Sequence, residues 1–282
     1  MSTTVRDTIR WALDNDEGAL IGRNGTIELD LMLRAPHSRD TRPYILEKNA
    51  GVFPIDRQGS FTRWRDASIQ ATKAADILAM GWYEPLRQAE AEQLKDWGVS
   101  ALPITLRDLE PYYSPIGDQW TSEIAGQRVA VVSCFTQSMK YQVTKGWSAI
   151  WCGKLNMPNN VDWAWIQTGH APKVAQGKNE WPPQVGSWED AVSHVVQEVI
   201  ASGARIAIIG CGGLGMIIGS QLKDRGVICI VMGGAIQVLF GIKGRRWETH
   251  SIISKFWNDE WVWPLDSEKP GLASSIEGGC YW

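Results

Sequence analysis

The sequence lacks the cysteine patterns that mark a disulfide scaffold or a structural zinc site. Its five cysteines are odd in number and widely spaced, and they form no C-x-x-C pair. We therefore expect reduced thiols and a cytoplasmic protein. No apolar run has the length of a membrane span, and residues 1–18 lack the apolar core of a secretory signal. The sequence thus predicts no membrane anchor.

An excess of positive charge is also missing. The chain has 28 Lys and Arg against 31 Asp and Glu, a formal net charge of −3. Without a global basic field, non-specific binding to nucleic acid or to a membrane surface is not indicated. Any contact with a polyanion must be local. The abundant residue is tryptophan, at 16 of 282 positions, which we expect mainly in the core and at interfaces.

Two expected strands in the last third of the chain are each followed by a glycine turn. Gly210, Gly212 and Gly215 fit G-x-G-x-x-G after an apolar strand at 205–209 and open a helix that reaches about residue 224. Glycine at such a turn lets backbone N–H groups close on a phosphate at the positive end of a helix. The alternative is that the glycines only allow tight turns.

The second strand, expected at 227–232, ends in Gly233 and Gly234. An NAD site usually carries an Asp or Glu at this place to hold the ribose hydroxyls. Because no carboxylate is present here, hydride chemistry on NAD is disfavoured. An NAD-dependent oxidoreductase is left as a second alternative function that rests on the first glycine motif alone.

A basic segment follows the second glycine turn. Gln237 is followed by Lys243, Arg245 and Arg246, three cations within four residues and flanked by glycines. Such a cluster suits a diphosphate. Its alternative is a solvated charged face. Together with the two glycine turns, the cluster favours a ligand site.

The element pattern predicts an α/β fold: a Rossmann-like parallel sheet flanked by helices, with a more helical N-terminal part. Prolines, glycines and aromatics at 111–126 suggest a division into residues 1–125, an N-terminal α/β part, and 126–282, a Rossmann-like nucleotide-binding part. One continuous domain is the alternative. We further expect one long helix from 61 to 79 and irregular loops over 146–184.

Polar residues follow two other expected strands. The strand at 128–133 ends in Ser133, and Gln137 lies in the turn of helix after it, where both could contact hydroxyls of a sugar or nucleotide or serve helix capping. Near the N-terminus, a short strand leads through Arg23 and Gly25 to Glu28, in the first turn of a helix at 26–33. Glu28 there is a structural residue at a positive helix end or a ligand.

Several motifs, in this order, resemble a family of largely uncharacterised proteins often associated with surface-polysaccharide genes. They are R-x-G-x-x-E at 23–28, V-S-x-F-x-x-S at 132–138, G-C-G-x-x-G at 210–215, G-G-x-x-Q-x-x-F-G-x-K-G-x-R-W at 233–247 and E-G-G-C-Y-W at 277–282. That family is similar, more distantly, to GT-D type glycosyltransferases, whose signature is Arg-x-Gly-Asp-Gly-Glu. In this chain Thr26 replaces the Asp and Ile27 replaces the second Gly.

The resemblance implies a glycosyltransferase that uses a nucleoside-diphosphate sugar. It implies a Mn²⁺ or Mg²⁺ ion, for which Glu28 is the one carboxylate left in the signature. Glu28 would be a metal ligand or the catalytic base, and Arg23 would pair with it or with phosphate. The acceptor is open between a glycan, a lipid-linked carrier, a protein and a modified base, and a homo-oligomer is also left open. The first alternative is a non-catalytic nucleotide-binding or scaffold protein.

Overall fold

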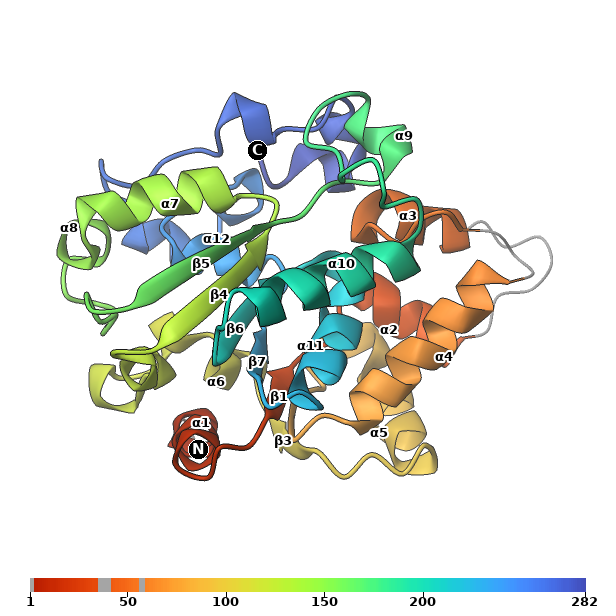
Figure 1. Cartoon of the computed structure of the whole chain (residues 1–282), viewed down its shortest axis with the longest axis horizontal. Coiled ribbons are helices and arrows are strands. Elements are labelled where there is room, and N and C mark those ends of the chain that lie inside the picture. The colour runs from red at the N-terminus through yellow and green to blue at the C-terminus, as the bar shows by residue number, and fades with distance from the viewer. Residues whose placement is uncertain (1–2, 35–41, 56–58) are drawn as a thin grey trace.

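The computed structural model describes residues 3–34, 42–55 and 59–282, which form a sheet of seven parallel strands covered by helices on both faces (Figure 1). The strands are β1 (Ala19–Gly22), β2 (Ile77–Ala79), β3 (Leu102–Ile104), β4 (Arg128–Ser133), β5 (Asp162–Gln167), β6 (Ile206–Gly210) and β7 (Ile228–Val231). Their order across the sheet is β3-β2-β1-β7-β6-β4-β5. The predicted fold class is confirmed.

Twelve α-helices connect or cover these strands in the described part of the chain. They are α1 (Thr3–Asp14), α2 (Thr26–Leu33), α3 (Arg42–Ala50), α4 (Ser60–Lys73), α5 (Arg87–Asp96), α6 (Leu106–Leu109), α7 (Thr136–Lys145), α8 (Trp147–Trp151), α9 (Pro172–Ala175), α10 (Trp188–Ala201), α11 (Gly215–Lys223) and α12 (Ala235–Leu239). Short 3₁₀ turns make up most of the remaining regular structure, including residues 245–247 and several turns beyond them.

The strands separate two apolar cores because successive strand residues point to opposite faces of a sheet. In β1, Leu20 packs with α2, α4, α10 and α11 on one face, whereas Ile21 packs with α1, α7, α8 and α12 on the other. Figure 1 shows α4, α10 and α11 together in front of the sheet. Apolar residues on both faces explain why the strands read as continuous apolar runs in the sequence.

The two parts of the chain share this single sheet. β1 pairs in parallel with β7, with Ile21 opposite Ile230, and on its other side with β2. The segment proposed as a linker, 111–126, contains three 3₁₀ turns, and the last of them packs on α1. The first and last strands of the sequence order therefore lie side by side at the middle of the sheet.

Two local expectations are wrong. The expected helix at 61–79 ends at Lys73, and β2 begins at Ile77. Between them Asp76 accepts a hydrogen bond from the backbone N–H of Leu20 (2.8 Å) and pairs with Lys223 (2.7 Å), which ties this part of the chain to β1 and to the end of α11. The expected loop region 146–184 contains β5, whose Trp163 packs edge-on against Phe240 (5.5 Å between ring centroids).

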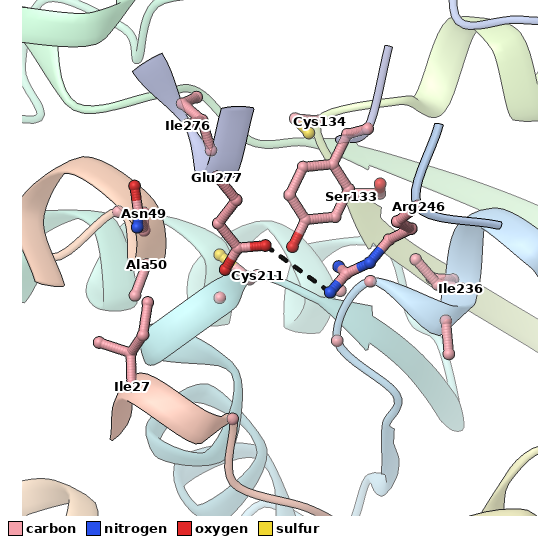
Figure 2. Close-up of a pocket in the computed structure, with 18 of the residues that line it drawn as sticks. Ile27, Asn49, Ala50, Ser133, Cys134, Cys211, Ile236, Arg246, Ile276 and Glu277 are labelled. Carbon is pink, nitrogen blue, oxygen red and sulfur yellow. Dashed lines mark ion pairs between the residues drawn. The ribbon is translucent and has the colours of Figure 1, made fainter. Parts of the chain in front are cut away.

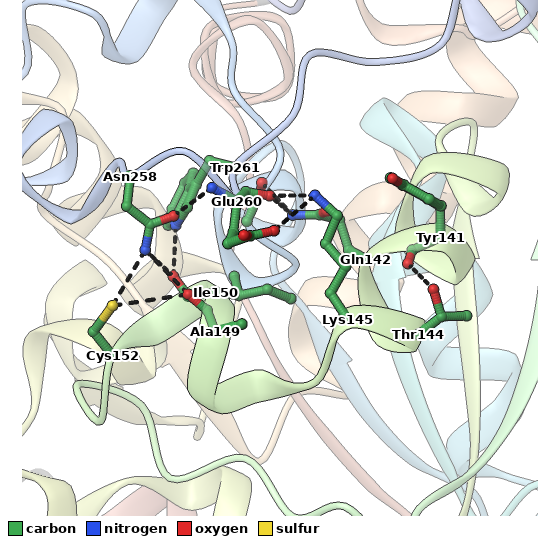
Figure 3. Close-up of polar contacts among 11 residues, drawn as sticks. Tyr141, Gln142, Thr144, Lys145, Ala149, Ile150, Cys152, Asn258, Glu260 and Trp261 are labelled. Atoms are coloured by element: carbon green, nitrogen blue, oxygen red, sulfur yellow. Dashed lines mark hydrogen bonds and ion pairs between the residues drawn. The ribbon is translucent and has the colours of Figure 1, made fainter.

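Residues 258–268 lie against α7 and α8 and are fixed by hydrogen bonds to them, several of which are drawn in Figure 3. The Gln142 amide donates to the carbonyls of Gly241 (2.9 Å) and Glu260 (3.1 Å). The indole N–H of Trp261 donates to the carbonyl of Ile150 (2.8 Å). These contacts hold an irregular segment in one place, so that its final residues reach the carboxyl ends of the strands.

Helix α11 packs closely on the sheet at Gly219, where a larger side chain would push against buried leucine and valine side chains. A Cβ there would lie 2.7 Å from Leu20 Cδ1 and 3.1 Å from Val231 Cγ2. We predict that Gly219→Val lowers the free energy of unfolding by about 1–3 kcal/mol, the usual cost of overpacking a core. Urea denaturation followed by circular dichroism measures it. Gly117→Val, at a position with open space around it, is the control, and equal losses in both variants would contradict the prediction.

Candidate functional site

A pocket of about 350 Å³ lies at the carboxyl ends of the strands. Its wall includes residues that follow every one of the seven strands; taken from β3 to β5 these are Leu106, Trp82, Arg23, Gly233, Cys211, Cys134 and Thr168. Ligands of open parallel sheets bind at this edge, at the point where neighbouring strands send their connections to opposite faces. The pocket is therefore where the topology predicts a ligand site.

Arg23 and Gly233 meet at that crossover. After β1 the chain enters α2 on one face of the sheet, and after β7 it enters α12 on the other. Nη2 of Arg23 donates to the carbonyl of Met232 (3.4 Å), and its guanidinium lies over the Trp82 ring (5.4 Å). Gly233 has φ +59°, and a Cβ there would lie 2.4 Å from Nη2. Glycine is required at 233 because the Arg23 guanidinium covers the turn.

A second guanidinium reaches the same turn from the other side. Arg246 lies close to Gly234, where a Cβ would be 3.2 Å from its Nη1. The Arg246 guanidinium is 4.9 Å from the centre of the Tyr281 ring and pairs with the Glu277 carboxylate (3.6 Å) (Figure 2). The Gly233–Gly234 turn thus lies between two arginines that line the pocket.

The first glycine turn is covered by apolar side chains and backbone, not by arginines. Gly210 and Gly212 line the pocket and Gly215 does not. A Cβ would lie 2.5 Å from Ile236 at Gly210, 2.5 Å from the Ala50 carbonyl at Gly212 and 2.9 Å from Val231 at Gly215. Tight packing of helix, strand and the end of α3 therefore accounts for these glycines.

Glu28 and Gly25 lie together in the pocket wall at the start of α2. A Cβ on Gly25 would lie 2.1 Å from Glu28 Oε2, so the glycine makes room for the carboxylate. Burial raises the pKa of Glu28, and the charge of Glu277 adds to the rise. The backbone N–H of Glu28 and the charge of Arg23 oppose it. A raised pKa suits a carboxyl group that exchanges protons with a substrate.

The other predicted site residues are divided between the wall and positions outside it. Ser133 lines the pocket, and its Oγ accepts the N–H of Phe135 (3.1 Å). Gln137, Gln237, Lys243 and Arg245 are not among the lining residues. The backbone N–H of Gln137 donates to Glu268, and the buried Gln237 amide donates to the carbonyls of Lys243 and Tyr281. Lys243 Nζ lies over the Trp257 ring (5.7 Å), and Arg245 is exposed.

Two carboxylates that line the pocket, Glu110 and Glu277, are not among the site residues predicted from the sequence. Glu110 is 8% exposed, accepts the hydroxyl of Tyr112 (2.8 Å) and has its pKa raised by burial. It directly precedes the segment expected as a linker, 111–126, and no motif marks it. Glu277 stood in the C-terminal motif but without a role; it has φ +46°, which an L residue rarely adopts, and this backbone directs its side chain toward Arg246.

The donor set does not fit a metal held by protein groups alone. Across residues 3–34, 42–55 and 59–282, no three His, Cys, Asp or Glu side chains are grouped closely enough to hold an ion. Glu277 is paired with Arg246. The positive charges that line the pocket belong to Arg23, Arg246 and Lys48.

Comparison with known proteins adds a distant likeness in structure. No protein-family model matches the chain, and no curated protein matches it. Two solved structures do, both of domain of unknown function 1792, and one is described as having a distinct glycosyltransferase fold. The first has TM-score 0.43 and 9% identity over 82% of this chain and 77% of that one; the second has 0.42 and 9% over 81% and 76%. The activity has to be argued from the pocket.

Within the described residues, every helix is too short or too polar to cross a lipid bilayer.

Replacing Glu28 by Gln should stabilise the protein at neutral pH. Because the native pKa is raised above the ordinary carboxyl value of 4.5, the folded state binds more protons than the unfolded one between these values, and stability falls as pH rises. We expect Glu28→Gln to have the higher Tm at pH 7, and the difference to shrink as pH falls toward 4. Differential scanning calorimetry across this range tests it; a lower Tm of the variant at pH 7 would contradict it.

Proposed function

We propose that the chain is a glycosyltransferase that uses a nucleoside-diphosphate sugar. The observation that carries the proposal is the Gly233–Gly234 turn, held between the guanidinium groups of Arg23 and Arg246 at the crossover of the sheet. A guanidinium group binds phosphate oxygens through two parallel N–H···O hydrogen bonds, and both arginines line the pocket beside this turn. A dinucleotide enzyme would need a carboxylate at this turn.

The arrangement suits departure of a diphosphate. As the bond between the sugar C1 and the phosphate oxygen breaks, negative charge grows on the diphosphate, where Arg23 and Arg246 stabilise it. The acceptor hydroxyl oxygen forms the new bond to C1, and its proton passes to the carboxylate of Glu28. The products are the glycosylated acceptor, the free nucleoside diphosphate and a protonated Glu28, which returns its proton to water.

A divalent ion stays a separate proposal. The protein groups around the pocket do not supply three ligands, so a Mg²⁺ or Mn²⁺ ion would depend on the donor's own phosphates for most of its coordination. We assign no step to it. Nucleotide binding measured with Mn²⁺ and with EDTA decides whether the arginines suffice.

The arginine assignment has a matched control in the neighbouring residue. We predict that Arg246→Ala weakens binding of the preferred nucleoside diphosphate about 10- to 150-fold, since charge-assisted hydrogen bonds contribute about 1.5–3 kcal/mol. Arg245→Ala should leave it within twofold, because Arg245 does not line the pocket, whereas Arg246 does. Isothermal titration calorimetry with UDP, GDP and dTDP measures both. Equal effects of the two substitutions would refute the assignment.

Glu28→Gln should abolish sugar transfer while the protein stays folded. The amide keeps the shape of the side chain and cannot take the proton. Release of nucleoside diphosphate from a panel of UDP-, GDP- and dTDP-sugars measures turnover, with circular dichroism as the folding control. Wild-type turnover in the variant would remove Glu28 from the mechanism. Nucleotide binding without turnover in the wild-type protein would favour the non-catalytic binding protein instead.

A further inference from the structure

The two arginines divide the pocket into two flanks of different chemistry. The β4–β5 flank consists of Ser133, Cys134, Phe135, Thr168, His170, Trp181 and Trp282. The β2–β3 flank consists of Trp82, Leu106, Glu110 and Tyr113. A transferase binds a nucleoside on one side of the diphosphate and the sugar with its acceptor on the other. If the proposed function holds, the difference between the flanks assigns these places.

The β4–β5 flank is aromatic and uncharged. The Trp282 ring lies 5.8 Å from both Phe135 and His170. Burial lowers the pKa of His170 to about 4, so the imidazole is neutral at physiological pH. Within the described residues, three buried ring nitrogens of this flank have no hydrogen-bond partner: Nε2 of His170 and the indole nitrogens of Trp181 and Trp282. Flat rings with unpaired nitrogens suit a heteroaromatic base, which stacks on rings and offers hydrogen-bonding edges.

The β2–β3 flank combines two aromatic side chains with a carboxylate. Trp82 and Tyr113 are half-buried, and among the described residues the buried indole N–H of Trp82 has no hydrogen-bond partner. Glu110 is 8% exposed and lines the pocket, and its Oε2 accepts the hydroxyl of Tyr112. Unpaired polar groups at a buried wall are costly unless a ligand completes them. A carboxylate oxygen and an indole N–H complement the donor and acceptor of a sugar hydroxyl.

The carboxylates on this side of the pocket wall favour a neutral acceptor over an anionic one. Glu110 lines the β2–β3 flank, Glu28 and Glu277 line the pocket beside it, and the whole chain carries a net charge of −3. An anionic acceptor such as a nucleic acid would meet carboxylates at this side. We propose that the β2–β3 flank binds a neutral carbohydrate acceptor, stacked on Trp82 and Tyr113 and held through a hydroxyl by Glu110, with the donor's nucleoside on the β4–β5 flank.

The test separates acceptor binding from nucleotide binding. Wild-type protein, Glu110→Gln and the exposed control Glu248→Gln are given the nucleotide sugar that the wild type hydrolyses, with p-nitrophenyl glycosides of glucose, galactose and N-acetylglucosamine as acceptors. Glu110→Gln should raise the KM for the best glycoside at least tenfold, with the nucleoside-diphosphate Kd changed less than twofold. Glu248→Gln should change neither. If Glu110→Gln does not fold, Tyr113→Ala is measured in its place and should show the same split.

The outcomes distinguish two failures. Absence of nucleoside-diphosphate binding and donor hydrolysis in the wild-type protein defeats the proposed function, and this inference with it. Donor hydrolysis without transfer to any glycoside, transfer to an oligonucleotide instead, or a Glu110→Gln variant that loses nucleotide affinity with unchanged glycoside KM overturns the acceptor assignment alone.

Discussion

The site depends on the parallel pairing of β1 with β7. This pairing brings residues 23 and 233 together, although 209 positions separate them in the chain, and it places the Arg23 guanidinium against a turn that has no side chain. The two strands send the chain to opposite faces of the sheet, which opens the crevice at their ends. A shift of this pairing by one residue would move Leu20 out of one core and Ile21 out of the other, so apolar packing fixes the register.

The pocket is lined by three cations, Arg23, Lys48 and Arg246, and by three carboxylates. Arg23 and Arg246 lie beside the glycine turn, and Glu28, Glu110 and Glu277 surround them. Burial raises the pKa of Glu28 and the pKa of Glu110. Arg23 partly offsets the rise at Glu28, and Arg23 and Arg246 partly offset the rise at Glu110. A carboxyl group kept close to protonation beside fixed cations can take a proton when a substrate displaces water. The same burial costs stability, a common trade at functional sites.

Much of the sheet could be predicted from sequence and the pocket only in part. β4, β6 and β7 are apolar runs bounded by glycine or polar residues, so pattern alone located them. β2 and β3, each of three residues, are too short for a periodic signal, and β2 was read as the end of a helix. Arg23, Glu28, Gly233 and Arg246 line the pocket, and each belongs to a sequence motif. Glu110 and Trp82 carry no local pattern; they reach the pocket through strand order, which the sequence does not specify.

Glu277 belongs to the C-terminal motif at 277–282, but the motif alone does not indicate what its carboxylate does. Its strained backbone, φ +46°, is followed by Gly278 and Gly279 at φ +70° and +78°, and its carboxylate pairs with Arg246 at the position proposed for phosphate. A diphosphate that binds Arg246 must compete with this carboxylate. Burial is the main cause of the raised pKa of Glu28, and the charge of Glu277 adds to it. Under the proposed function, a diphosphate that displaces Glu277 from Arg246 would change the charge beside the proposed base, so this one ion pair would couple donor binding to the protonation of Glu28.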